Sequence, residues 1–203
     1  RGEGISNTLL TEVINVISKT KNITIKNPEI NKKSSGLDYV FPEKIIALIH
    51  FGRSGTGLLH SLIDGHTEVS TLPSIYFSEY FDHSTWNKIT VNGWHGMVDC
   101  FIATYEVLFD ASSNVSIETQ GKKMLNKIGY KEGMTTVGNN QDEVLSLDKT
   151  LFRKELTHLM ECQKILDAFI FFKLIHLAYE RVIKNYNQKN IIFYHIHNPD
   201  TYA

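Results

Sequence analysis

The sequence predicts a three-layer α/β domain, with a central parallel sheet between two layers of helices. Two apolar runs, at residues 45–49 and 190–196, have the length and β-branched content of buried parallel strands. Stretches with helical spacing lie next to both runs. With 203 residues, of which 42% are hydrophobic, the chain can bury one sizeable core. We therefore expect a single domain that spans residues 1–203.

The N-terminal residues 1–41 are predicted to lead into this domain without contributing chemistry. Apolar residues at helical spacing in 8–18, after the capping signal Ser6-Asn7-Thr8, predict a short amphipathic helix. Residues 19–41 are rich in Lys, Asn and Ser and include a proline and a glycine. This composition predicts an irregular connection to the first strand.

The first strand should run directly into a turn and a helix. Residues 45–49 show no polar alternation, so we expect this strand to be covered on both faces. Three glycines then interrupt regular structure, at positions 52, 55 and 57. After the glycines, apolar residues recur at helical spacing (Leu58, Leu59, Leu62 and Ile63), which predicts a helix, and Asp64-Gly65 provides its stop.

The turn, residues 52–57, has the properties of an anion loop. A helix that begins at Ser54 to Gly57 directs unpaired backbone N–H groups and the positive end of its dipole into the turn. Arg53 adds a fixed cation, and Ser54 and Thr56 add two hydroxyl donors. The loop therefore predicts a site for phosphate or sulfate that needs no metal.

The anion loop is P-loop-like but departs from the Walker sequence G-x-x-x-x-G-K-[ST]. Gly52 and Gly57 have the Walker glycine spacing. Leu58 and Leu59 occupy the positions of the lysine and of the magnesium-binding hydroxyl. The usual groups for binding a magnesium triphosphate are therefore missing.

Residues 52–59, together with Leu62, Asp64-Gly65-His66 and Val69, resemble the 5′-phosphosulfate loop and first helix of sulfotransferases that use 3′-phosphoadenosine 5′-phosphosulfate (PAPS). The resemblance implies a catalytic role for Arg53. It also implies a set of cofactor-binding residues: Gly52, Arg53, Ser54, Gly55, Thr56, Gly57 and Leu58. The family usually has a second threonine where this chain has Gly57, so one hydroxyl contact is lost and the backbone donor is kept.

The second run, 190–196, resembles the other signature of the same family. There a strand leads into an Arg-Asp-Pro or Arg-Asn-Pro turn, and a later serine joins the arginine in binding the 3′-phosphate. Here the turn reads His197-Asn198-Pro199, so the resemblance implies that His197 binds the cofactor. Histidine is only partly charged near neutral pH. The serine would fall beyond Ala203, so we expect the domain to be incomplete at its C-terminal end.

His195 and His197 lie on one face of this predicted strand, which could suggest a pair of metal ligands. No cysteine or carboxylate converges on them in the sequence, so we expect no metal site.

A general base is expected after the second predicted strand, 68–72. Ligands of parallel sheets bind at the carboxyl ends of strands, and sulfuryl transfer needs a base to accept the proton of the acceptor. Glu79 and His83 are the first candidates, and Asp82 is a third. The alternative is that the aromatic residues of 76–81 pack in the core, with solvated polar residues between them.

The remainder of the chain is predicted mainly from helical spacing. We expect a helix over 98–109 that starts near Gly96, a loop over 121–140, and helices over 149–160 and 163–186. His158 and His176 fall within the last two helices and are interpreted as packing or surface residues. In the resembling family, the middle of the chain shapes the acceptor pocket.

Charge and composition exclude several classes of function. A net charge of −1 gives no sign of a nucleic-acid surface. Two cysteines without C-x-x-C spacing favour a reducing, cytoplasmic setting over a disulfide or zinc framework. The most apolar run, 165–179, contains Asp, Lys and His and is shorter than the roughly 20 residues that span a bilayer.

The sequence therefore predicts a sulfotransferase that uses PAPS, with a small-molecule or carbohydrate acceptor that offers a hydroxyl or an amine. Two alternatives stay open. One is a P-loop kinase of small molecules or nucleotides, which Leu58 and Leu59 disfavour. The other is a degenerate, non-catalytic nucleotide-binding module, in which His197 has replaced the phosphate-binding arginine.

Overall fold

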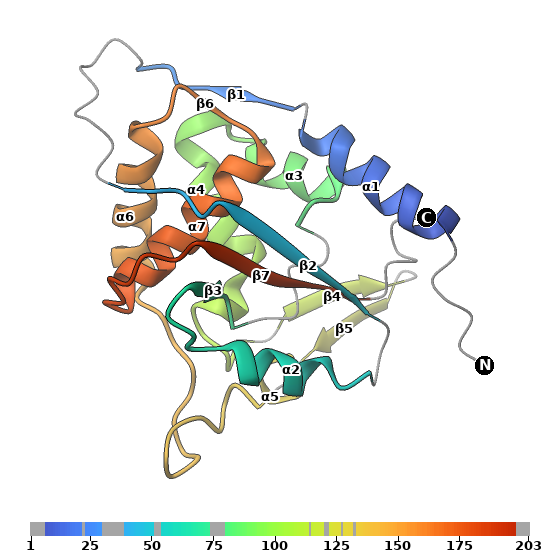
Figure 1. The fold of residues 1–203 in the computed structure, drawn as a ribbon, viewed down its shortest axis with the longest axis vertical. Coiled ribbons are helices and arrows are strands. Elements are labelled where there is room, and N and C mark those ends of the chain that lie inside the picture. Colours follow the sequence, from blue (N-terminus) through green and yellow to red (C-terminus); the bar gives the residue numbers. More distant parts are fainter. Residues whose placement is uncertain are drawn as a thin grey trace.

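The structure is a computed structural model, and it describes residues 7–21, 23–29, 39–50, 54–73, 80–113, 115–119, 122–126, 128–131 and 133–197 (Figure 1). The strands are β1 (Ile25–Lys26), β2 (Lys44–His50), β3 (Val69–Thr71), β4 (Val115–Thr119), β5 (Lys122–Asn126), β6 (Ile165–Leu166) and β7 (Ile191–His197). The helices are α1 (Asn7–Lys21), α2 (Thr56–Ile63), α3 (His83–Thr90), α4 (Gly93–Thr104), α5 (Ile128–Lys131), α6 (Lys149–Glu161) and α7 (Ala168–Val182), with a 3₁₀ turn η2 (Glu106–Leu108).

A three-stranded parallel sheet confirms the α/β class. β7 lies in the middle, between β2 and β3, and is parallel to both. Its register with β2 runs from Lys44 opposite Ile191 to His50 opposite His197. The carboxyl ends of β2 and β7 therefore meet at one edge of the sheet, where the anion loop begins (Figure 1).

The two faces of β7 contact different helices. Phe193 and His195 lie next to His60 of α2, with ring centroids 6.2 and 4.9 Å away. Tyr194, on the other face, packs against Phe172 of α7 at 5.2 Å. Alternate residues of a strand point to opposite faces, so β7 connects α2 to the main core.

The main core is formed by the helices and is rich in aromatic residues. α6 packs along α7, and α3 packs along α4. The largest fully buried side chains come from these helices and the segment before α3: Trp86, Tyr80, Phe81, Phe101, Phe152, Phe171 and Phe172. The aromatic alternative for residues 76–81 is thus confirmed at Tyr80 and Phe81, which are 0% exposed.

β2 is more exposed than the sequence predicts. Ile46 is 45% exposed, and Leu58 and Leu62 on the following helix are 69% and 75% exposed. The expectation that this strand is covered on both faces is therefore wrong. Among the residues the structure describes, β2 has a strand neighbour on one side only, and an edge strand lacks the lateral cover of a central one.

Helix boundaries differ from the predictions where local interactions intervene. α7 begins at Ala168 and not at Gln163, because Ile165 and Leu166 pair with β1. Asp167 then caps the helix, since its side chain accepts a hydrogen bond from the N–H of Ile170 at 2.7 Å. α4 begins at Gly93, three positions before the predicted start, and η2 replaces its predicted last turn.

The prediction of a loop over residues 121–140 is partly wrong. β4 and β5 form an antiparallel hairpin, and the short helix α5 follows it. Gly129 of α5 lies against residue 111, because an added Cβ would be 1.8 Å from the carbonyl oxygen of Ala111. This contact joins distant parts of the chain, so local sequence pattern did not indicate it.

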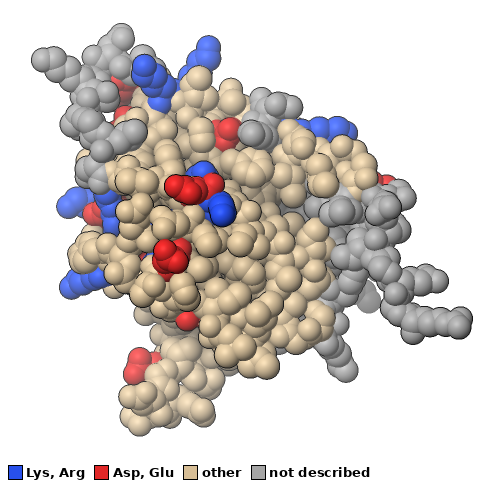
Figure 2. Space-filling view, viewed as in Figure 1, with Lys and Arg blue, Asp and Glu red and all other residues tan. Residues whose placement is uncertain are grey.

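Two further features concern the described helices and the charged side chains on one face of the surface. None of these helices is long and apolar enough to cross a membrane. On the face in Figure 2, basic and acidic side chains are interspersed, and no large patch has a single sign among the coloured residues.

Candidate anion-binding site

The described part of the anion loop begins at Ser54 and leads directly into α2. Gly55 is the N-cap residue, with φ 76° and ψ 10°, a left-handed conformation that glycine adopts without a Cβ penalty. The N–H groups of Leu58 and Leu59 both donate to the carbonyl of Gly55, at 3.1 and 3.3 Å. Gly52 and Arg53 lie outside the described residues.

The first turn of α2 is open to solvent. Ser54, Gly55 and Gly57 are exposed, and Thr56 is half-buried. An added Cβ at Gly55 or Gly57 would meet nothing within 4 Å. The N–H groups that precede the first intrahelical bonds are therefore accessible to a bound anion.

Three histidines and Thr56 form a hydrogen-bonded chain beneath this turn. Thr56 Oγ1 lies 3.2 Å from His50 Nδ1, and His50 Nε2 lies 3.3 Å from His195 Nδ1. The other ring nitrogen of His195, Nε2, lies 2.9 Å from Nδ1 of His60. We call these four residues the histidine chain. It connects the end of β2, the centre of β7 and the middle of α2.

Sequence reasoning did not single out His50 or His60. The sequence relates His195 only to His197, as a possible pair of metal ligands. One signal was present, because His50 ends the strand before the glycines and His60 is one helical turn after Thr56. Linking the two through His195 required the register of β2 against β7, which no local pattern contains.

The histidine chain lies largely out of water. His195 is 0% exposed and His50 is 6% exposed. Burial lowers the pKa of His60 below its ordinary value, and the nearby carboxylate of Asp64 partly opposes this. Asp64 is itself held by Thr71 of β3, whose hydroxyl donates to Oδ1 at 2.5 Å.

The geometry of the histidine chain is that of a relay and not of a metal centre. A metal ion needs one nitrogen from each ligand directed at a common point. His195 instead uses its two nitrogens for two different neighbours. Over the described residues, no group of three or more His, Cys, Asp or Glu is arranged to hold a metal ion.

The candidate bases near α3 have local hydrogen bonds. Asp82 is the N-cap of α3 and accepts from the N–H of Ser84 at 3.2 Å. Nδ1 of His83 lies 3.0 Å from the side-chain nitrogen of Asn87. α3 packs chiefly on α4 and α1. Glu79 lies outside the described residues.

The second signature is described only in part. His197 is the last residue of β7, opposite His50 in the register, so its backbone lies at the edge where the anion loop begins. Its side chain and residues 198–203 lie outside the described residues.

A second polar cluster lies behind β3, on α7. The ring of His176 contacts the hydroxyl of Ser70 through Nδ1 at 2.9 Å, and that hydroxyl donates to Glu180 Oε1 at 2.7 Å. Burial lowers the pKa of His176 to about 3 and raises the pKa of Glu180. Among the described residues, His176 Nε2 and Glu180 Oε2 have no hydrogen-bond partner.

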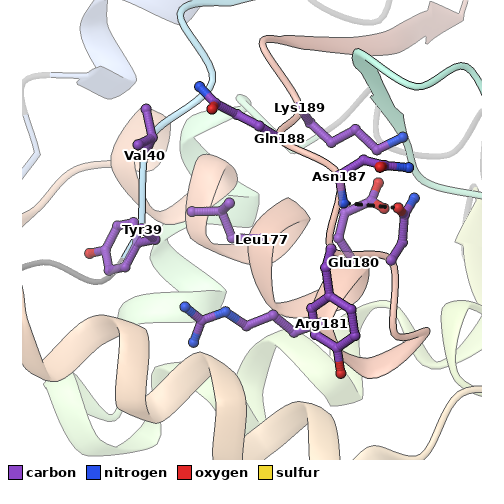
Figure 3. A pocket seen from close by; sticks show the side chains of 10 residues that line it. Tyr39, Val40, Leu177, Glu180, Arg181, Asn187, Gln188 and Lys189 are labelled. Atoms are coloured by element: carbon purple, nitrogen blue, oxygen red, sulfur yellow. Dashed lines mark hydrogen bonds between the residues drawn. The ribbon is translucent and has the colours of Figure 1, made fainter.

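A pocket of about 380 Å³ lies at the amino ends of the parallel strands, whereas the anion loop lies at their carboxyl ends. Its lining residues precede β2 and β7, and Figure 3 shows Tyr39 and Val40 facing Glu180 and Lys189 across it. The strands are parallel, so their amino ends share this edge. The pocket is therefore separate from the candidate anion site.

No family model matches the chain, and no curated protein or solved structure matches it. Function is therefore inferred from the candidate site and from the resemblance of its sequence.

Proposed function

We propose that this protein is a P-loop-like, three-layer α/β sulfotransferase that transfers a sulfuryl group from PAPS to a hydroxyl or amine of a small-molecule or carbohydrate acceptor. One observation carries the proposal. The open first turn of α2, led by left-handed Gly55, follows the carboxyl end of β2 and lies beside the carboxyl end of β7. Crevices at this edge of a parallel sheet are where such folds bind ligands.

The residues present fit the anionic part of the cofactor. The N–H groups at the start of α2 and the hydroxyl of Thr56 are donors, and an anion accepts hydrogen bonds. The cofactor supplies an activated sulfuryl group. The donors at Thr56 and Gly57 would stabilise the negative charge that develops during transfer, and the resemblance adds Arg53 to this role.

The acceptor must lose a proton during transfer, so a base is required. We retain Glu79 and His83 as the proposed bases, with Asp82 as the third candidate. The cap at Asp82 gives this residue a structural role that can be separated from a catalytic one by mutation.

Two rival functions use the same loop. A P-loop kinase would need magnesium and ATP, for which Leu58 and Leu59 provide no ligands. A degenerate module would bind the nucleotide without transferring any group, and the replacement of the phosphate-binding arginine by His197 favours it.

Calorimetric titration with 3′-phosphoadenosine 5′-phosphate tests the proposal, beside ATP with and without magnesium. We expect metal-independent binding of the bisphosphate, weakened in Arg53→Ala and in Thr56→Val. Transfer from PAPS, measured over a panel of hydroxyl and amine acceptors, should be largely lost in Arg53→Ala.

The rivals give different results in the same measurements. ATP binding that depends on magnesium would support the kinase. Bisphosphate binding without transfer to any acceptor would support the degenerate module. Wild-type turnover in Arg53→Ala would contradict the catalytic role of that residue.

A further inference from the structure

The histidine chain links the anion loop to the half-buried surface of α2. Thr56 is its first member, His50 and His195 are the interior members, and His60 is the last. Both ring nitrogens of His50 and of His195 lie within hydrogen-bond distance of a neighbour in the chain. Because His195 is 0% exposed, protein groups must satisfy its nitrogens.

The hydrogen bonds among these described residues allow two neutral arrangements of the chain. A neutral imidazole has one N–H donor and one acceptor nitrogen. The tautomer of each ring therefore fixes the tautomer of the next. Either all three rings carry the proton on Nε2, or all three carry it on Nδ1.

The two arrangements differ in what the Thr56 hydroxyl can do. In the Nε2–H form, His50 Nδ1 is an acceptor and takes the only proton of Thr56. In the Nδ1–H form, His50 Nδ1 donates to the Thr56 oxygen, so the hydroxyl proton can point into the anion loop. A fully ionised oxyanion offers only acceptors, so it interacts favourably with the second form alone.

We propose that His50, His195 and His60 are positioning residues that set the direction of the Thr56 hydroxyl, and that an oxyanion bound at the first turn of α2 switches all three rings from Nε2–H to Nδ1–H. This inference rests on the proposed function, since it specifies how the same loop obtains a hydroxyl donor.

The surroundings of His60 favour its neutral form. Burial lowers the pKa of His60, so this ring holds a proton less readily than an exposed histidine. Asp64, at the end of α2, is the acidic group that acts on His60 in the opposite direction. The tautomers are therefore measured at pH 8, where His60 is neutral.

¹⁵N NMR of the protein labelled with ¹⁵N-histidine tests the change of tautomer directly, because protonated and unprotonated ring nitrogens have well separated chemical shifts. The three chain rings are assigned by single His→Gln variants. We expect all three as Nε2–H in sulfate-free buffer, and all three as Nδ1–H at saturation with sulfate or with 3′-phosphoadenosine 5′-phosphate. His158, which is exposed on α6, should not change and is the internal control.

Variants at the two ends of the chain provide an independent test. Thr56→Val should weaken anion binding roughly tenfold or more, as expected for a lost hydrogen bond to a charged group, and the tautomer reversal should disappear. Thr56→Ser keeps the hydroxyl and should retain the reversal. At the other end, His60→Gln keeps a hydrogen-bonding group beside His195 Nε2 and should retain the reversal.

The outcomes separate this inference from the proposed function. Mixed tautomers in the anion-free protein, or unchanged tautomers with bisphosphate bound, would overturn the positioning role while leaving the sulfotransferase proposal in place. A reversal by sulfate in a protein that does not bind the bisphosphate would uphold the positioning role and overturn the cofactor assignment. If neither anion binds, both proposals fail.

Discussion

His195 of β7 and His60 of α2 lie 135 positions apart in the sequence, yet their ring nitrogens Nε2 and Nδ1 are 2.9 Å apart. This contact fixes the helix that follows the anion loop to the central strand of the sheet. His60 also packs near Phe193, with ring centroids 6.2 Å apart. The position of the first turn of α2 therefore depends on β7 as well as on β2, which precedes the loop.

Gly57→Thr restores the hydroxyl that the resembling sulfotransferases usually have. An added Cβ meets nothing within 4 Å, so the larger side chain fits. We expect bisphosphate binding to tighten by roughly twofold to tenfold, the range of one net hydrogen bond, measured by calorimetry. Gly57→Val has the same shape without the hydroxyl and is the control. Equal affinities of the two variants would contradict a hydroxyl contact at this position.

Gly55→Ala should destabilise the protein, because residue 55 has φ 76°. A Cβ in this left-handed conformation costs about 1 kcal/mol or more, which urea unfolding can measure. Gly57→Ala lies two positions away, inside the same helix, and should be neutral or slightly stabilising. If the two variants were equally stable, the left-handed N-cap would not exist in solution.

Asp82 can be tested as a cap and as a base in the same pair of variants. Asp82→Ala should lower the free energy of unfolding by about 1 kcal/mol, because the cap of α3 is lost. Asp82→Asn should keep this stability, since asparagine is also a good cap. If Asp82→Asn retains stability but loses transfer activity, the residue is the base. Retained activity leaves Glu79 and His83 as the candidates.

His176 should make the protein sensitive to acid. Burial lowers its pKa from 6.5 to about 3 in the folded state. Between these two pH values the unfolded chain therefore binds the proton more tightly than the folded protein does. The free energy of unfolding should fall as the pH falls from about 6.5 towards 3, by up to about 1.4 kcal/mol per pH unit. In His176→Gln, urea unfolding from pH 7 to pH 4 should show a shallower decline.

The control for this measurement is His158→Gln, on the exposed face of α6. It leaves the buried ring of His176 in place, so the loss of stability between pH 6.5 and pH 3 should persist. An unchanged profile in His176→Gln would mean that this ring takes up its proton equally readily in the folded and the unfolded chain.

The sequence predicted those parts of the fold that local pattern determines. The apolar runs became β2 and β7, the parallel pairing was confirmed, and the stop at Asp64-Gly65 ended α2 as expected. The predictions were wrong where contacts with distant residues determine the local structure. Ile165 forms a strand because β1 lies beside it, and Gly129 packs against Ala111 from a segment that reads as loop.

The candidate site was predicted to a similar extent. The helix start was predicted between Ser54 and Gly57, and the structure places it at Thr56, after left-handed Gly55. His50 and His60 were missed, because each has its role only through His195. A contact between a strand end and a helix face follows from register, and register is set by the whole sheet.

The central position of β7 also constrains how the protein is made. Within the described residues, β2 and β3 have strand partners only in β7, which begins at Ile191. A ribosome must therefore synthesise the chain at least as far as Ile191 before the parallel sheet can start to form, although the helical core of α3, α4 and α6 precedes it. The half-exposed apolar segment of β2 has no strand partner in the sheet during this time. Unpaired apolar strands aggregate readily. The yield of soluble protein on expression should therefore depend on chaperones that shield residues 44–50.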